Sequence, residues 1–512
     1  MGASRPGCLV DGYTSSAMLI NYLHKIKPSI NIQYRQQDGK EHGINANHVP
    51  SGVDLVLLPD SGSADFAEHK KLRERGIDII VLDHHEVENN QESKHAIVVN
   101  NQLSPKFDNN SFSGAGVTFK FLEALDDRLE VDYANTYLDL LALGIIGDSM
   151  LVSEKENRYY ITKGLKRIKN PLVKEILKSQ EYSTGGVVDI TSISFFINPL
   201  FNAVVRSGSK EEKNQVFEAL LGDGTEEVYY ERGKKYEPLT TNTVRMMKRV
   251  RVRQNKLRDK GVEAIEEKIA EKNLLNNKIL TVEVTNVLDP NLSGLVANRL
   301  AQSYKRPTLL VRWDDDNATL SGSARGYENG YIKDLKGYLD SMNQFIYLRG
   351  HPNAHGVKII PNNLIEVNNM INKDLKNIEL DTGSYDVDFE IDMKHLTKGF
   401  ITTLNDYSDL WGKGVESPLL MIHSINVNKT AVLLQGKSKN VLKFAVNGIE
   451  FIKFGSSEEE YKSIVDVEEK KSRQVSINVI GKASMNTFRG QKTPQIMIED
   501  FEVEEAEDKL LF

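Results

Sequence analysis

The sequence has one cysteine, no long apolar run and no excess of basic residues. The single thiol, Cys8, excludes an internal disulfide framework and any zinc site built from several cysteines. No apolar stretch approaches the roughly 20 residues that span a bilayer. Residues Met1 to Gly7 also lack the apolar core of a secretory signal. We therefore expect a cytoplasmic protein without a membrane anchor.

The net charge is −7, whereas nucleic-acid-binding proteins are usually basic overall. This balance argues only mildly against such a role, because a local cationic groove can coexist with an acidic exterior. The length of 512 residues predicts two to four domains. Hydrophobic residues make up 40% of the chain and charged residues 27%, which is a globular profile.

The first region reads as α/β, with polar side chains where predicted strands end. An apolar run from Val53 to Leu58 leads to Asp60, and a strand from Asp78 to Leu82 leads to Asp83-His84-His85. A predicted helix of about 64–75 joins the two strands, and this spacing is typical of a right-handed βαβ unit in a buried parallel sheet.

Two further acidic residues are expected near the same place. Asp11 should begin a turn after the short apolar run Cys8-Leu9-Val10, and Asp148 follows an apolar helix of about 133–146. Ligands of open α/β sheets bind beyond the carboxyl ends of the strands, so these segments would deliver their side chains to one rim. Taken singly, each aspartate is equally well explained as a helix cap or a turn residue.

Carboxylates with one or two imidazoles favour Mn²⁺ or Mg²⁺, and the lack of thiolates makes zinc a poorer fit. Two such ions a few Å apart would support attack of water on a phosphodiester. The set as a whole therefore predicts a metal site with hydrolytic chemistry.

The rest of the chain divides into further regions. A polar helix over 243–260 carries many lysines and arginines, and it is either a solvated interdomain helix or a surface that follows phosphates. A second α/β region spans about 278–366, and short strands with turn signals follow it, which suggests a small β-barrel. We expect five segments: an α/β domain 1–240, a connecting helix 241–275, a second α/β domain 276–380, a barrel 381–502 and an acidic tail 503–512.

Four ordered motifs give the chain a family resemblance. It resembles the DHH phosphoesterase superfamily through Asp11-Gly12-Tyr13-Thr14-Ser15-Ser16, Leu58-Pro59-Asp60-Ser61-Gly62, Asp83-His84-His85 and Leu143-Gly144-Ile145-Ile146-Gly147-Asp148. Within this superfamily, the segment Asn198 to Arg206 resembles a loop of the RecJ branch. The members of that branch are single-strand-specific 5′→3′ exonucleases. Gly322 to Arg325 and Gly350 to Gly356 resemble the associated DHHA1 domain. Trp411 to Pro418 and Arg489 to Asp500 resemble the family's OB-fold domain. The chain as a whole looks most like the phage or prophage versions of this enzyme.

The resemblance implies roles for individual residues. Asp11, Asp60, His84 and Asp148 would bind one metal ion, with Asp60 bridging to a second, while Asp83 and His85 complete the motif and orient His84. Ser323 and Arg325 would hold the 5′-terminal phosphate, with backbone N–H groups of a Gly-Ser loop assisting, and His351 would contact phosphate. Asn202 and Arg206 are expected in a loop facing the active cleft. The implied partner is single-stranded DNA, bound by a monomer between the two α/β domains.

The first motif departs from the family's pattern. Gly7 and Leu9 occupy positions that usually carry ligands of the second ion, and the strand expected before Asp11 is missing. Three explanations stay open: a wrongly started or truncated active enzyme, a weak one-ion nuclease, or a degenerate protein that binds single strands without cutting them. Hydrolysis of small phosphoesters or short oligonucleotides is a further alternative. The acidic tail with an apolar tip, Leu510-Leu511-Phe512, is a candidate for docking on a replication partner.

Overall fold

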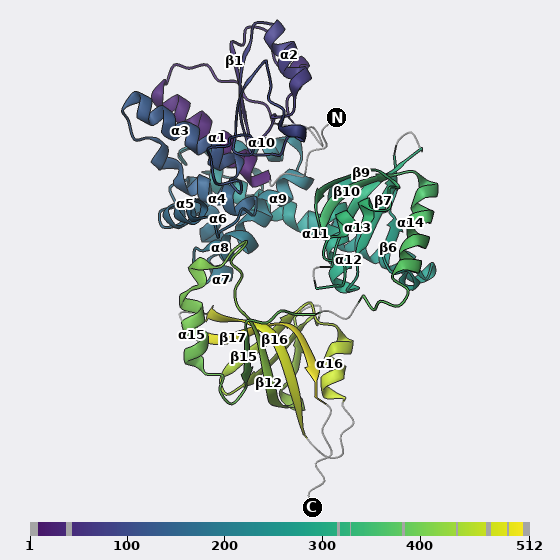
Figure 1. Cartoon of the computed structure of the whole chain (residues 1–512). Helices are drawn as coiled ribbons and strands as arrows, with labels where there is room; N and C mark the ends of the chain where they lie inside the picture. The colour runs from purple at the N-terminus through teal and green to yellow at the C-terminus, as the bar shows by residue number, and fades with distance from the viewer. Residues whose placement is uncertain are drawn as a thin grey trace, which may run out of the picture.

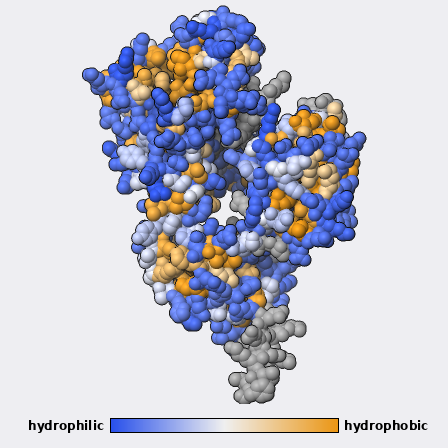
Figure 2. Space-filling view, in the orientation of Figure 1, coloured by the Kyte–Doolittle hydropathy of each residue, from blue (hydrophilic) through white to orange (hydrophobic). Residues whose placement is uncertain are grey.

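The computed structural model describes residues 9–36, 43–314, 318–327, 329–380, 384–436, 439–466, 473–488 and 491–504. Three lobes follow one another along the chain, two of them α/β and the third mainly β (Figure 1). The surface is hollowed where the three lobes meet (Figure 2). Among the described residues, no helix is long and apolar enough to cross a membrane.

The first lobe contains a small parallel sheet and a large helical part. Its strands are β1 (Leu55–Pro59), β2 (Asp78–Asp83) and β3 (Ile97–Asn100), in the order β1-β2-β3. Its helices are α1 (Leu9–Ile26), α2 (Phe66–Glu74), α3 (Gly114–Leu129), α4 (Leu138–Gly147), α5 (Lys155–Leu165), α6 (Pro171–Ser179), α7 (Glu181–Thr184), α8 (Ile190–Ser192), α9 (Asn198–Ser207) and α10 (Lys210–Leu221). A π-helical turn, η4 (Ile193–Ile197), joins α8 to α9. The hairpin β4 (Glu227–Tyr230) and β5 (Lys235–Pro238) ends the lobe.

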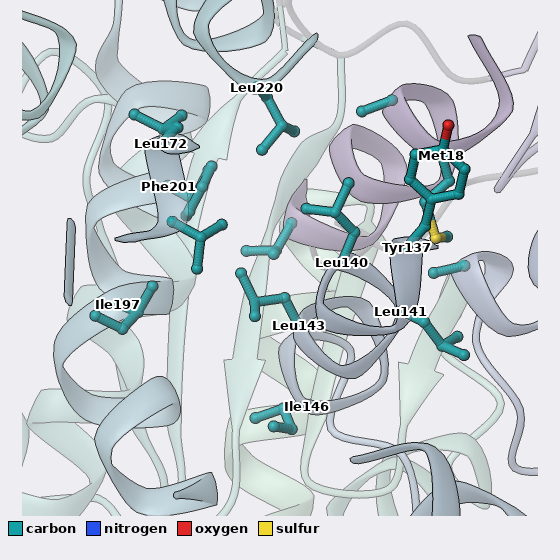
Figure 3. Close-up of a cluster of buried hydrophobic side chains, with 14 of the residues drawn as sticks. Met18, Tyr137, Leu140, Leu141, Leu143, Ile146, Leu172, Ile197, Phe201 and Leu220 are labelled. Atoms are coloured by element: carbon teal, nitrogen blue, oxygen red, sulfur yellow. The ribbon is translucent and has the colours of Figure 1, made fainter. Parts of the chain in front are cut away.

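Helix α4 is the centre of this lobe's core (Figure 3). Most of its residues are apolar and buried, as expected for a helix in the interior of a lobe. Leu140, Leu143 and Ile146 of α4 lie among side chains of other helices, such as Leu172 of α6 and Phe201 of α9. Because α4 ends at Gly147, this packing fixes the position of the following residue, Asp148.

A long helix, α11 (Leu239–Glu271), connects the first two lobes. Its N-terminal part packs through Val244, Met247 and Val250 into the first core, whereas Val262 and Ile265 belong to the core of the second lobe. The predicted polar helix is therefore present, and it is longer at both ends than the basic stretch. Arg245 and Arg253 are paired with Glu237 and Glu212.

The second lobe is a five-stranded mixed sheet in the order β6-β7-β8-β10-β9. Its elements are β6 (Leu280–Glu283), α12 (Ser293–Ser303), β7 (Thr308–Trp313), β8 (Leu320–Arg325), α13 (Leu335–Asp340), β9 (Phe345–His351), β10 (Ala354–Ile359) and α14 (Pro361–Asp374).

The third lobe contains a sheet with the strand order β11-β12-β16-β17-β15-β14-β13. Its elements are β11 (Phe389–Asp392), α15 (Lys398–Asp406), β12 (Leu419–Asn428), β13 (Leu433–Gln435), β14 (Val441–Val446), β15 (Ile449–Phe454), α16 (Glu458–Val465), β16 (Gln474–Phe488) and β17 (Gln491–Val503).

The structure corrects three local expectations. Asp11 does not begin a turn: α1 starts at Leu9, and an aspartate in the first turn of a helix is electrostatically favourable. Asn202 and Arg206 lie on helix α9 instead of in a loop. Gly322 to Arg325 form part of β8 and not a loop, and β8 pairs with β7 on one side and β10 on the other. The backbone N–H groups of this stretch are therefore within a sheet, and side chains alone are left for contacts with phosphate.

Candidate functional site

The candidate metal site lies where β1, β2, α1 and α4 meet. His84 Nε2 is 3.3 Å from Asp60 Oδ1 and 3.4 Å from Asp148 Oδ2. Ligand atoms of Asp11, His84 and Asp148 all lie within 4.8 Å of one another, and so do those of Asp60, Asp83, His84 and His85. Thus the six residues expected at this rim meet at one place, with His84 common to both groups.

Small residues make room for these side chains. A Cβ on Gly114 would lie 2.6 Å from Asp60 Cβ and 2.7 Å from its Cα. A Cβ on Gly144 would lie 2.5 Å from Asp11 Oδ1. Asp60 itself has φ 60°, a left-handed conformation that a non-glycine residue adopts at some cost and that often occurs at functional sites. The backbone around the two aspartates is therefore adapted to this arrangement.

Among the described residues, two buried carboxylate oxygens in the site have no hydrogen-bond partner, Asp11 Oδ2 and Asp60 Oδ1. The other oxygen of Asp11, Oδ1, accepts a hydrogen bond of 3.0 Å from the N–H of Ala115 at the start of α3. Burial, followed by the charges of Asp11, Asp148 and Asp83, raises the pKa of Asp60 well above its usual range, although His85 opposes this. A divalent cation would supply the missing partner and the missing positive charge, so the donor set fits Mn²⁺ or Mg²⁺.

Asp83 forms hydrogen bonds within and around the segment Asp83-His84-His85. Its Oδ1 accepts hydrogen bonds from the backbone N–H of His84 at 2.8 Å and from His85 Nδ1 at 2.7 Å, while Oδ2 accepts from the N–H of Ser63 at 3.0 Å. Burial alone would raise the pKa of Asp83, but the hydrogen bond and charge of His85 hold it below the usual range. The same partnership raises the pKa of His85 despite its burial.

One buried residue near the site was not predicted. Asn100 ends β3 and donates hydrogen bonds to Ser63 Oγ at 2.8 Å and to the carbonyl oxygen of His85 at 2.9 Å. It ties the loops after β1 and β2 together. The signal that identified Asp60 and Asp83, a polar residue where a strand ends, applies equally to Asn100 and could have found it.

The residues expected to bind substrate lie on the two facing lobes. Burial lowers the pKa of Arg325 on β8, and the positive charge of nearby Arg206 on α9 lowers it further. A Cβ on Gly294 would lie 2.5 Å from Arg325 Nη2, so the glycine in α12 leaves space for this guanidinium. The side-chain oxygen of Asn202 is buried and has no hydrogen-bond partner in the part of the chain that the structure describes. Ser323 lies on β8 beside Arg325, and His351 is exposed at the end of β9.

Carboxylates and an imidazole at the rim of an α/β lobe, followed by a second α/β lobe and a β-lobe, are the arrangement of a DHH-type phosphoesterase. Comparison with known proteins agrees. The DHH family, N-terminal domain, matches residues 9–145, and the RecJ OB domain matches residues 387–500. The chain belongs to the DHH family and, within it, to the RecJ-like branch.

Individual relatives are consistent with this assignment. The putative SPbeta prophage-derived single-strand DNA-specific exonuclease YorK of Bacillus subtilis (strain 168) is 44% identical, over 98% of this chain and 87% of the relative. The single-stranded-DNA-specific exonuclease RecJ of the same organism is 24% identical, over 97% of this chain and 60% of the relative. The crystal structure of RecJ in complex with Mn²⁺ from Thermus thermophilus matches with a TM-score of 0.69 at 21% identity. That match covers 97% of this chain and 68% of that chain, and it shows the shared fold.

Proposed function

We propose that this chain is a metal-dependent exonuclease that degrades single-stranded DNA from its 5′ end. The observation that carries the proposal is the meeting of Asp11, Asp60, His84 and Asp148 around one place, with two buried carboxylate oxygens that lack a hydrogen-bond partner among the described residues. Relatives named as single-strand DNA-specific exonucleases support the choice of substrate. Structures of RecJ with Mn²⁺ and with Mg²⁺ support either ion as the cofactor.

In this proposal Asp11, Asp60, His84 and Asp148 hold the metal, and Asp83 and His85 orient His84. When bound, the ion supplies charge stabilisation for the phosphodiester oxygens and activates water for attack at phosphorus. Arg325, Ser323 and His351 of the second lobe bind the terminal phosphate, and Asn202 and Arg206 of α9 position the strand. The barrel lobe guides the strand, as OB-folds do with cationic and aromatic surface groups. We propose that the protein acts as a cytoplasmic monomer, in DNA recombination, repair or replication.

The departures at Gly7 and Leu9 motivate a second candidate, a protein that binds single strands without cutting them. Leu9 is the first residue of α1, and Gly7 lies outside the described residues, as does the C-terminal tip proposed to dock on a replication partner. If the second ion is lost, several kcal/mol of transition-state stabilisation goes with it, at about 1.4 kcal/mol per tenfold in rate. Hydrolysis of small phosphoesters explains less, because such substrates need no strand-guiding lobe.

One assay separates these candidates. A 5′-labelled single strand is incubated with Mn²⁺ and the full chain, its His84→Ala variant, or His395→Ala, a control at an exposed histidine of the barrel lobe. If the chain is a nuclease, the wild type and His395→Ala should both release mononucleotides. The cleavage rate of His84→Ala should fall by at least about a hundredfold. Tight, salt-sensitive binding of an intact strand supports the binding protein instead. Equal cleavage by all three chains would remove His84 from the mechanism.

A further inference from the structure

A short loop of the third lobe, 411–415, contacts the segment that follows Asp148. The backbone N–H of Val152 donates a hydrogen bond of 2.7 Å to the carbonyl oxygen of Lys413. The loop is closed by two backbone hydrogen bonds between Gly412 and Val415, of 2.9 and 3.0 Å. The third lobe is thus bonded, backbone to backbone, to the first lobe four residues beyond a proposed metal ligand. Figure 1 shows the third lobe approaching the first beside α7 and α8.

Glycines bring the two backbones this close. A Cβ on Gly412 would lie 2.5 Å from Val152 Cγ2 and 3.4 Å from Ile190 Cδ1. A Cβ on Gly414, which has φ +80°, would lie 2.8 Å from Leu151 Cδ2 and 3.1 Å from Ser153 Oγ. A larger residue at either position would push the loop away from the first lobe.

The segment after Asp148 is held on its other side by the first lobe. Leu151 accepts a hydrogen bond of 2.8 Å on its carbonyl from Asn157 Nδ2, and its N–H donates one of 2.8 Å to Ser111 Oγ. Within the segment, Ser149 has φ 54° and ends α4 in a Schellman motif, in which its N–H donates to the carbonyl oxygen of Ile146 at 3.2 Å and the N–H of Met150 donates to that of Ile145 at 3.1 Å. The segment is therefore clamped between two lobes, and one side of the clamp is the loop 411–415.

The same loop also reaches the helix that carries the substrate-binding residues. Ile190, which faces Gly412, begins α8, and α8 continues through η4 into α9 with Asn202 and Arg206. π-Helical turns inside helices are rare and frequently accompany functional sites. One loop of the third lobe thus touches the chain beside a proposed metal ligand and the start of the helical stretch that leads to the proposed strand contacts.

We propose that the loop 411–415 is a positioning element that holds Asp148 in its metal-binding place, so that docking of the third lobe sets the affinity of the site for its ion. This rests on the proposed function, in which Asp148 is a metal ligand. Groups that orient a ligand without touching the metal commonly change metal affinity by ten- to a hundredfold. The loop acts through Leu151 and Val152 and touches neither metal nor substrate.

The test compares two glycines of the third lobe that have similar backbone conformations. Gly455 has φ +76° and no atom within 4 Å of an added Cβ, whereas Gly414 has φ +80° and faces Leu151. Gly414→Ala and Gly455→Ala therefore share the cost of an alanine in a left-handed conformation and differ in the contact. Each full-length variant is measured for Mn²⁺ affinity by calorimetry without DNA, for single-strand affinity in chelator, and for amide exchange over 148–157.

We expect Gly414→Ala to weaken Mn²⁺ binding about tenfold and to raise amide exchange over 148–157, while single-strand affinity in chelator changes less than twofold. Gly455→Ala should leave Mn²⁺ affinity within twofold of wild type. Adding Leu151→Ala to Gly414→Ala removes the clashing Cδ2 and should restore most of the affinity. A merely structural defect of the third lobe would lower single-strand affinity as well, and equal effects of both alanines on Mn²⁺ would overturn the inference.

Failure of the proposed function and failure of the inference give different results. If the wild-type chain binds no Mn²⁺, the proposed function fails and the inference with it; if it binds Mn²⁺ and the two alanine variants behave alike, only the inference fails. Should Gly414→Ala not fold, Leu151→Ala alone decides the question from the other side of the contact. That truncation should weaken Mn²⁺ binding by a few fold and raise exchange over 148–157, and unchanged values would overturn the inference.

Discussion

At the scale of single residues, the candidate metal site depends on glycines, which leave room for the acidic side chains, as much as on the candidate ligands themselves. Gly114 and Gly144 leave the space in which Asp60 and Asp11 lie, and one buried oxygen of each aspartate has no hydrogen-bond partner among the described residues. Asp83, by contrast, has hydrogen-bond partners on both oxygens, including the backbone N–H of His84 and the ring of His85. Residues with the same side chain therefore have different tasks, and hydrogen bonding distinguishes them.

Replacing Gly114 by alanine should disable the metal site. The new Cβ would approach Asp60 Cα to 2.7 Å, which is closer than real contacts allow, so the loop holding Asp60 must move. A displacement of about 1 Å in a catalytic group can cost a hundredfold in rate, and we expect a loss of that order in DNA degradation with weaker Mn²⁺ binding. Gly399→Ala is the matched control, because Gly399 also lies in the first turn of a helix and its Cβ would meet only Thr397 Oγ1 at 3.7 Å. Similar losses in both variants would contradict the steric explanation.

His355 should make the second lobe sensitive to acid. Its side chain is 2% exposed, and burial, with added repulsion from Arg325 and Lys336, lowers its pKa to about 4. Since the unfolded pKa is about 6.5, the unfolded state binds more protons between these values, and stability falls as the pH drops from about 6.5 to about 4. Amide exchange of β9 and β10, compared at pH 7 and pH 5, should show local opening becoming easier by up to about 2 kcal/mol. His355→Gln should lose most of this pH dependence, whereas His395→Gln, at an exposed position, should keep it.

At the scale of elements, the sequence predicted what depends on strong local patterns. The sequence predicts a helix over 293–303 and a strand over 308–313, and α12 and β7 have these bounds; β1 ends one residue before Asp60 and β2 ends at Asp83, because apolar runs bounded by glycine or polar residues define these elements clearly. In the third lobe, the alternating pattern of 385–391 predicts a strand, and the structure has the shorter β11 (Phe389–Asp392) there; β15 has no counterpart among the predicted strands, because short strands take their bounds from pairing with distant neighbours.

The errors near the site have the same origin. A strand and a loop are hard to distinguish in Gly322 to Arg325, where glycine and serine favour a turn, until β7 and β10 pair with that stretch from both sides. Gathering of the aspartates was predictable from a general property of parallel sheets, whereas the glycine contacts and the Asn100 bridge depend on packing between segments far apart in the chain. The domain boundaries and the roles of individual site residues remain predictions.

Helix α11 should act as a rigid spacer, and breaking it should separate the two lobes functionally. Leu257 lies between Val250, in the core of the first lobe, and Val262, in that of the second, and its own side chain is 48% exposed. A proline there removes a helix hydrogen bond and costs about 3 kcal/mol or more without emptying a core position. Leu257→Pro should therefore keep Mn²⁺ binding but lose at least about tenfold in degradation of long single strands. Leu257→Ala controls for the loss of the side chain, and wild-type activity in the proline variant would exclude the spacer role.

At the scale of the whole molecule, the third lobe touches both of the others, so the lobes are linked in a closed arrangement. Asp500 of β17 accepts a hydrogen bond of 3.1 Å from the Tyr385 hydroxyl and pairs with Lys305 of the second lobe at 3.3 Å. The contact of Lys413 with Val152 links the same lobe to the first. In the proposed function, we expect a strand bound by the third lobe to reach the candidate metal site best while both links hold.

Asp500→Ala tests the link to the second lobe. The substitution removes the ion pair with Lys305 and the hydrogen bond from Tyr385. We therefore expect the third lobe to move more freely, with a larger radius of gyration in solution scattering. Degradation of long strands should need several-fold more substrate for half-maximal rate, whereas cleavage of a dinucleotide, too short to reach the third lobe, should be unchanged. Glu499→Ala is the neighbouring control, because Glu499 pairs with Lys482 inside the third lobe. Because an exposed ion pair contributes only about 0–1 kcal/mol, the folded structure should survive both changes, and a deficit that is equal on long and short substrates would show that Asp500 serves stability instead of lobe docking.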